Sequence, residues 1–220
     1  MSDPGAEPAD ATGAGEARLV DTPLGPARAT TTRPDGIPAG TLVLGHGAGG
    51  LRWTLDVLAT RDASVAAGWS VVLVDQPWRV AGRKLGPAPA SLDQAWLPVL
   101  EALAPGFGRG PLVVGGRSAG ARVACRTAAA VGAGAVLALS FPLHPPGKPA
   151  SSRAHELAMP SAHGIPVHVV QGRTDPFGTP AEVEAALPPG ATLDVVTGAH
   201  SLGGSAAVVA ALVVQRLRAG

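Results

Sequence analysis

Residues 111–121 read Pro-Leu-Val-Val-Gly-Gly-Arg-Ser-Ala-Gly-Ala, and this stretch decides the fold. It opens with a short apolar run, which is typical of a strand buried on both faces of a sheet. The run ends in Gly116-Arg-Ser-Ala-Gly120, the G-x-S-x-G pattern of a sharp turn that presents a serine between a strand and a helix. Residues 119–131 after it have helical character. The stretch therefore predicts a strand–turn–helix unit with Ser118 exposed at the turn.

Further short runs rich in Val and Leu lie on both sides of this unit, at residues 41–45, 69–75, 135–140, 167–172 and 192–198. Segments with helical character lie between or after them, at residues 51–67, 91–103, 181–187 and 205–218. Residues 18–33 could supply one or two leading strands. Strands that alternate with helices predict an α/β fold, with a mostly parallel sheet and helices on both faces.

Two local signals in segment 91–103 concern the start of its helix. Ser91-Leu-Asp-Gln94 has the form of a capping box, which places the helix start at Ser91. Pro98 lies in the same segment, and a proline inside a helix costs about 3 kcal/mol. We therefore expect the helix either to kink at Pro98 or to begin there.

Composition narrows the class of protein. The chain has 220 residues, the size of one ordinary domain, with 46% hydrophobic residues, a net charge of +1 and one cysteine, Cys125. This charge provides no basic field for nucleic acid, and one cysteine excludes an internal disulfide framework and a Cys-based zinc site. Residues 1–17 are acidic and interrupted by Pro and Gly, so we expect a disordered tail there and one domain over residues 18–220.

Signals for export or membrane insertion are not visible. The N-terminal segment has no apolar centre, and no uninterrupted apolar run reaches the about 18 residues of a membrane span. We expect a soluble, cytoplasmic protein that binds neither membrane nor nucleic acid. The sequence leaves the oligomeric state open.

The exposed serine needs a base, because a serine hydroxyl is a poor nucleophile at neutral pH. Functional residues of parallel sheets gather at the carboxyl ends of the strands. Of six histidines, His200 follows the last strand, from where a loop can reach Ser118. Asp175 follows the preceding strand, in position to orient the imidazole and stabilise its cation. The chain order Ser118, Asp175, His200 is that of the α/β-hydrolases.

The glycine run Gly45-His-Gly-Ala-Gly-Gly50 admits two interpretations. As an oxyanion loop, it brings the backbone N–H of Ala48 to the substrate, with the N–H of Ala119 as the second donor. As a G-x-G-x-x-G fingerprint followed by Asp75, it outlines the dinucleotide site of an oxidoreductase. Asp75 lies 30 residues after Gly45, against the about 20 of that fingerprint, and this interpretation leaves the serine, aspartate and histidine without a role. The oxyanion loop is favoured.

Six residues near the same strand ends are candidates for substrate binding: His46, Gly47, Arg79, Arg117, His144 and Lys148. If Arg79, Arg117 and Lys148 converge, they favour an acyl substrate with a carboxylate or phosphate, because arginine binds such groups bidentately. The alternative is that Arg117 packs beneath the turn against a local acid and that Lys148 is solvated.

Four segments together resemble a family of small, dienelactone-hydrolase-like α/β-hydrolases. They are Phe141-Pro-Leu-His-Pro-Pro-Gly-Lys-Pro149, His46-Gly-Ala-Gly49, Gly115-Gly-Arg-Ser118 and Gly172-Arg-Thr-Asp-Pro-Phe-Gly178. The family has bacterial members and is similar to hydrolase-like domains of an animal testis-expressed protein and an animal acetyltransferase-complex subunit.

The resemblance implies that Ser118 is the nucleophile, Asp175 the acid and His200 the base, without a cofactor. The chain departs from its relatives in having Ala119 where they usually carry Met, and Ala199 where they often carry Asp.

Together these observations predict an α/β-hydrolase fold with a minimal lid. The connection between the predicted strand that ends at 140 and the one that begins near 167 has only 25 residues, 141–165. This length leaves room for a loop and one short helix near 153–158. We expect hydrolysis of a small ester or related acyl bond through an acyl-serine intermediate, with no metal or cofactor. A serine acyltransferase, a catalytically silent hydrolase-like module that binds a partner, and a dinucleotide-binding oxidoreductase remain as alternatives.

Overall fold

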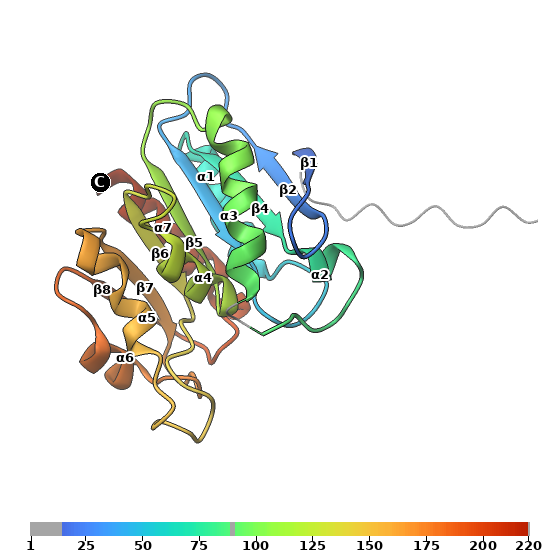
Figure 1. Ribbon diagram of the computed structural model, residues 1–220. Helices are drawn as coiled ribbons and strands as arrows, with labels where there is room; N and C mark the ends of the chain where they lie inside the picture. The colour runs from blue at the N-terminus through green and yellow to red at the C-terminus, as the bar shows by residue number, and fades with distance from the viewer. Residues whose placement is uncertain (1–14, 89–90, 220) are drawn as a thin grey trace, which may run out of the picture.

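A computed structural model describes residues 15–88 and 91–219 (Figure 1). Within them, eight strands form one sheet in the order β1-β2-β4-β3-β5-β6-β7-β8. The strands are β1 (Glu16–Val20), β2 (Ala27–Thr32), β3 (Thr41–Gly45), β4 (Ser70–Asp75), β5 (Leu112–Arg117), β6 (Ala135–Leu139), β7 (Val167–Gly172) and β8 (Thr192–Val196). Strand β2 runs antiparallel to both of its neighbours, and all other pairs are parallel. The predicted mostly parallel sheet is confirmed.

Helices cover both faces of the sheet, as predicted (Figure 1). On one face lie α3 (Leu92–Leu103) and α4 (Ala119–Thr127), and on the other α1 (Leu55–Ala66) and α7 (Ala206–Ala219). The shorter elements are α2 (Pro77–Val80), α5 (Ala154–Ala158), α6 (Pro180–Ala186), η2 (Ala104–Gly106), η3 (Pro160–His163) and η4 (Gly203–Ser205). Among the described residues, none of the helices combines the length and the apolar character that a membrane span requires.

Strand β3 shows why its apolar run belongs in the middle of the sheet. Every one of its residues is buried. Side chains alternate between the two faces of a strand, so Val43 packs with Trp96 in the core under α3 and α4. Leu42 and Leu44 pack with Val209 in the core under α1 and α7. A strand with a core on each face has to be apolar throughout.

The sheet begins earlier than predicted. Strand β1 starts at Glu16, so Glu16 and Ala17 pair with β2 and do not belong to the tail expected over residues 1–17. Only Val20 of this strand is buried, which is why the strand has no apolar pattern. Residues 1–14 of the expected tail lie outside the described residues.

Helix α3 starts where the first local signal placed it, with Ser91 as the residue that precedes the helix. Within the described part of the chain, however, the Ser91 side chain makes no hydrogen bond at the helix start, so the predicted capping box does not form. Pro98 lies inside a helix that starts at Leu92, so the helix does not begin at the proline. Trp96 and Leu100 are fully buried against the sheet. Their burial contributes several kcal/mol, enough to offset the about 3 kcal/mol that the proline costs.

The segment between β6 and β7 carries no helical lid. Its regular structure consists of α5 and η3, of five and four residues. The expected loop with one short helix is therefore confirmed, and the carboxyl ends of the strands stay uncovered by any larger insertion from this segment.

Candidate active site

Ser118 lies at the turn between β5 and α4. Its backbone has φ 54° and ψ −110°, a conformation that residues other than glycine rarely adopt. Its N–H donates to the carbonyl of Leu139 in β6 at 2.9 Å. A Cβ at Gly116 or Gly120 would collide with the carbonyl oxygen of Gly45 in β3. The two glycines of the motif are therefore required by the close approach of the turn to the neighbouring strand.

His200 lies between the serine and a buried carboxylate. Its Nε2 is 2.9 Å from Ser118 Oγ, and its Nδ1 is 2.9 Å from Asp175 Oδ2 and 3.1 Å from Oδ1. Asp175 is fully buried, whereas the His200 side chain is 19% exposed. A proton on Nδ1 is donated to the carboxylate, which leaves Nε2 to accept the serine hydroxyl. The structure thus brings together the three residues selected from the sequence.

The Asp175 carboxylate is oriented by two further donors. The Phe177 N–H donates to Oδ1 at 2.9 Å, and the Gln171 side-chain amide donates to Oδ2 at 3.0 Å. Gln171 is fully buried in β7, and its amide nitrogen also lies 2.9 Å from the Gly178 carbonyl. A buried carboxylate needs such donors to stay charged. Gln171 was not among the site residues predicted from the sequence, although a polar residue in the apolar run of β7 was the available signal.

The His200 imidazole also packs against an aromatic ring, and the loop that carries it is bonded to a neighbouring loop. The Phe177 ring lies with its centroid 4.2 Å from that of His200, at an interplanar angle of 33°. In the loop that carries His200, the Gly198 carbonyl accepts from the Thr174 N–H at 3.0 Å and from its hydroxyl at 3.2 Å. The loop after β8 is thereby bound to the loop after β7.

The glycine run passes directly beside the serine. A Cβ at Gly47 would lie 3.6 Å from Ser118 Cβ. The Ala48 N–H makes no hydrogen bond among the described residues, and Ala119 is the first residue of α4, where helix N–H groups have no intrahelical partner. Both amides are available to a substrate oxygen. This placement supports the oxyanion interpretation of the run.

The same run lacks the features of a dinucleotide site. Four residues separate Gly50 from the start of α1 at Leu55, so the run does not open directly into a helix N-terminus, as phosphate binding requires. Asp75, which would bind a ribose in such a site, instead faces a protein cation: its Oδ1 lies 3.3 Å from the Arg79 Nε.

His46 is not available to substrate, contrary to the expectation from the sequence, because both ring nitrogens bind the backbone. The Gln76 N–H donates to Nε2 at 3.0 Å, and Nδ1 donates to the Gly47 carbonyl at 2.7 Å. The ring also meets Trp53 and Trp78 edge-on, with centroids 5.5 and 5.0 Å away. His46 therefore holds the glycine run against the end of β4.

This environment predicts a pH dependence of stability. Burial, followed by the Arg79 cation, lowers the pKa of His46 from 6.5 to about 4. Between these pH values the unfolded chain binds a proton that the folded state excludes, so stability falls as the pH drops from about 6.5 to about 4. The pKa difference corresponds to about 3 kcal/mol. We expect His46→Gln to remove most of this pH-dependent loss in urea unfolding at pH 7 and pH 4; equal losses in both proteins would contradict it.

The two arginine candidates are engaged with protein oxygen atoms. Arg79 donates to the Leu51 carbonyl through Nε at 3.0 Å and Nη2 at 2.8 Å. Arg117 donates through Nη2 to the His200 carbonyl at 2.7 Å, and its Nε lies 3.9 Å from the Asp56 carboxylate. The second alternative for Arg117, packing beneath the turn against a local acid, is the one observed. Neither guanidinium is directed at a common anion site.

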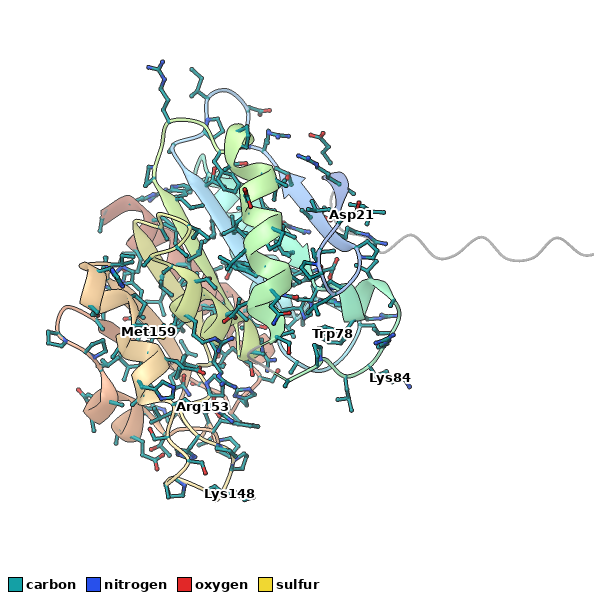
Figure 2. The ribbon with its side chains drawn as sticks, viewed as in Figure 1. Asp21, Trp78, Lys84, Lys148, Arg153 and Met159 are labelled. Atoms are coloured by element: carbon teal, nitrogen blue, oxygen red, sulfur yellow. The ribbon has the colours of Figure 1, made fainter. Side chains whose placement is uncertain are left out.

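The remaining two candidates lie on the loop after β6. Lys148 is exposed, and Figure 2 shows it at a loop tip at the bottom of the view, whereas Trp78, the neighbour of Arg79 in the chain, lies higher and to the right. His144 is buried, with Nε2 3.4 Å from the Glu182 carboxylate. The predicted convergence of Lys148 with the two arginines is therefore not observed.

Cys125 is fully buried in α4, and burial raises the pKa of its thiol to about 12. A thiol that stays protonated at neutral pH is a poor nucleophile and a poor target for alkylation. We expect Cys125→Ala to leave kcat for a small ester nearly unchanged, and native protein to resist iodoacetamide in an intact-mass measurement. Inactivation by this substitution with the melting temperature retained would indicate a thiol mechanism.

Comparison with known proteins identifies the family and the fold. Residues 38–208 match the family model described as "Alpha/beta hydrolase domain". No curated protein sequence matches the chain.

Solved structures resemble it over nearly their full length at low identity. An alpha-beta serine hydrolase homologue from Coxiella burnetii is 21% identical with a TM-score of 0.74, over 92% of this chain and 97% of that one. An α/β serine hydrolase without lid from Xanthomonas campestris is 17% identical with a TM-score of 0.72, over 93% and 94%. The esterase domain of a Rhodothermus marinus protein is 14% identical with a TM-score of 0.69, over 92% and 98%. These likenesses establish the shared fold, and the family match covers most of the chain: the protein belongs to the alpha/beta hydrolase family.

Proposed function

We propose that this protein is a serine hydrolase that cleaves a small ester or a related acyl bond. The observation that carries the proposal is the hydrogen-bonded chain from Ser118 Oγ through His200 to Asp175, with 2.9 Å on each side of the imidazole. A serine, a base and an orienting acid in this geometry form an activated nucleophile.

The reaction proceeds in two halves. Ser118 Oγ attacks the substrate carbonyl while His200 Nε2 takes its proton, and the bond to the alcohol breaks as His200 returns that proton to the leaving oxygen. Water then attacks the acyl-serine with His200 again as base, which releases the carboxylic acid and restores Ser118. Asp175 holds the imidazole and stabilises its cation throughout. The Ala119 and Ala48 N–H groups stabilise the oxyanion, together with the N-terminus of α4.

Fluorophosphonate labelling tests the proposal. The probe should add its phosphonyl group to the wild-type protein and leave Ser118→Ala unlabelled, as read by intact mass. A catalytically silent binding module gives no labelling. A competing alcohol or thiol acceptor separates acyl transfer from hydrolysis, because an acyltransferase forms the new ester faster than the free acid.

The uncovered strand ends predict substrate size. Since the β6–β7 segment supplies only α5 and η3, a long acyl chain receives no covering lid from this segment. We expect kcat/KM to fall from acetyl and butyryl to dodecanoyl p-nitrophenyl esters, without a rate increase when the ester exceeds its solubility. A preference for emulsified long-chain lipid would contradict this.

We further propose that the chain is a cytoplasmic enzyme without metal or cofactor. The resemblance of the segments around Phe141 and Gly172 supports a relation to the dienelactone-hydrolase-like branch and to the animal hydrolase-like domains. A panel of carboxylated and neutral lactones and esters would test that placement through the relative kcat/KM values.

A further inference from the structure

Arg117 stands where three segments meet beside the serine. Its Nη2 donates to the carbonyl of His200 at 2.7 Å, in the loop after β8. Its Nε faces the carboxylate of Asp56 in the first turn of α1, at 3.9 Å. Its Nη1 lies against Gly47 of the glycine run, where a Cβ would come within 3.2 Å of it. Each nitrogen of the guanidinium thus faces a different part of the site.

Asp56 explains why the guanidinium stays in place. Its side chain is fully buried, and neither carboxylate oxygen has a hydrogen-bond partner among the described residues. The 3.9 Å approach to Arg117 is too long for a hydrogen bond and is a contact between charges. A buried carboxylate is unfavourable without a neighbouring positive charge. Asp56 therefore holds Arg117, and Arg117 compensates Asp56.

The Arg117 guanidinium also contacts the loop that carries His200. The His200 side chain is bonded to Ser118 and Asp175, and the backbone carbonyl of the same residue is bonded to Arg117. A hydrogen bond from a charged donor is stronger than one between neutral groups. Because Arg117 immediately precedes the serine, it links the nucleophile's own strand to the histidine's loop.

We propose that Arg117 is a positioning residue, with Asp56 as its counter-ion, that fixes the distance between His200 Nε2 and Ser118 Oγ. It touches no reacting atom and acts through the backbone of His200. The inference rests on the proposed serine-hydrolase function. A displacement of about 1 Å between catalytic groups is enough to lower turnover about 100-fold.

The test uses Arg117→Gln, Arg117→Lys and the double variant Asp56→Asn/Arg117→Gln, assayed for kcat, KM and melting temperature with p-nitrophenyl acetate. Arg122→Gln is the matched control, because Arg122 is an arginine of similar burial whose side chain pairs with Glu156 at 2.6 Å and not with the loop of His200.

Both single Arg117 variants should lose about 100-fold in kcat with KM changed less than about threefold, since substrate contacts remain. Lysine keeps the charge but cannot face Asp56 and the His200 carbonyl at once. Arg117→Gln should also melt about 10 °C lower, because Asp56 loses its counter-charge. The double variant should regain most of the lost melting temperature, because Asp56→Asn removes the charge that needs a partner, but it should not regain kcat.

Chemical rescue provides a readout that a purely structural role would not move. It uses one further variant, Arg117→Ala, which leaves space for a free guanidinium ion. Guanidinium chloride at a non-denaturing concentration should raise the kcat of this variant severalfold over sodium chloride at equal ionic strength, and leave wild-type kcat unchanged. Arg122→Gln should have a lower melting temperature than wild type and an unchanged kcat.

Three results would overturn the inference. The first is a folded Arg117→Gln variant whose kcat lies within about threefold of wild type. The second is a double variant in which kcat recovers together with the melting temperature, which makes the role one of stability alone. The third is a wild-type protein that a fluorophosphonate does not label. That result overturns the proposed function and this inference with it, whereas the first two overturn the inference alone.

Discussion

Ser118→Ala is expected to lower kcat for a short ester by about 10⁶-fold, because the attacking oxygen is removed and the triad acts as a unit. The measurement is the initial rate of p-nitrophenyl acetate hydrolysis, with active-site concentration taken from fluorophosphonate titration of the wild type. The residual rate should come from oxyanion and substrate binding alone. His200→Ala should cost a similar factor, and combining the two should cost little more.

The loss should not come from unfolding. Ser118 is half-buried at a strand end, and alanine removes only its Oγ, which is hydrogen-bonded to His200 Nε2. We therefore expect the melting temperature of Ser118→Ala to stay within a few degrees of wild type. A variant that keeps near-full activity after purification from contaminating esterases would refute the assignment of the nucleophile.

Asp175→Asn is expected to lower kcat by about 10⁴-fold while the fold is retained. The asparagine side chain has almost the same shape, but its amide offers His200 Nδ1 only one acceptor oxygen and a competing N–H donor. An imidazole that accepts at Nδ1 carries its proton on Nε2, where it cannot take the proton of Ser118. The buried carboxylate accepts from His200 at 2.9 Å, so the substitution acts on that bond directly.

Asp194→Asn provides the control for this substitution. Asp194 lies in β8 and pairs with Arg216 at 2.9 Å, partly exposed and outside the triad. Its replacement should leave kcat unchanged and alter stability by less than about 1 kcal/mol. An Asp175→Asn enzyme as active as Asp194→Asn would show that another residue orients the histidine.

The regular elements could be predicted from the sequence where burial is uniform. The run at 41–45 coincides with β3, because a strand between two cores must be apolar at each position. Strand β1 could not be found in this way, since four of its five side chains are exposed at the sheet edge. The predicted capping box at Ser91 does not form, whereas Thr179 and Glu182 form one at the start of α6.

The sequence by itself determined which residues make up the candidate triad. The G-x-S-x-G turn identifies Ser118 through local sterics, and strand order places Asp175 and His200 after later strands, whose carboxyl ends meet at one edge of a parallel sheet. Both signals are local or follow from topology, so no knowledge of side-chain contacts is needed.

Only the tertiary structure decided what the surrounding polar groups do. Arg117 binds the carbonyl of a residue 83 positions away, and His46 accepts from a backbone N–H 30 positions away. From the sequence both residues were candidates for substrate binding. A charged or titratable side chain near a strand end looks the same in the sequence whether it faces a ligand or a buried backbone atom. Their roles depend on which desolvated partner lies within hydrogen-bond distance, and packing between distant segments determines that distance.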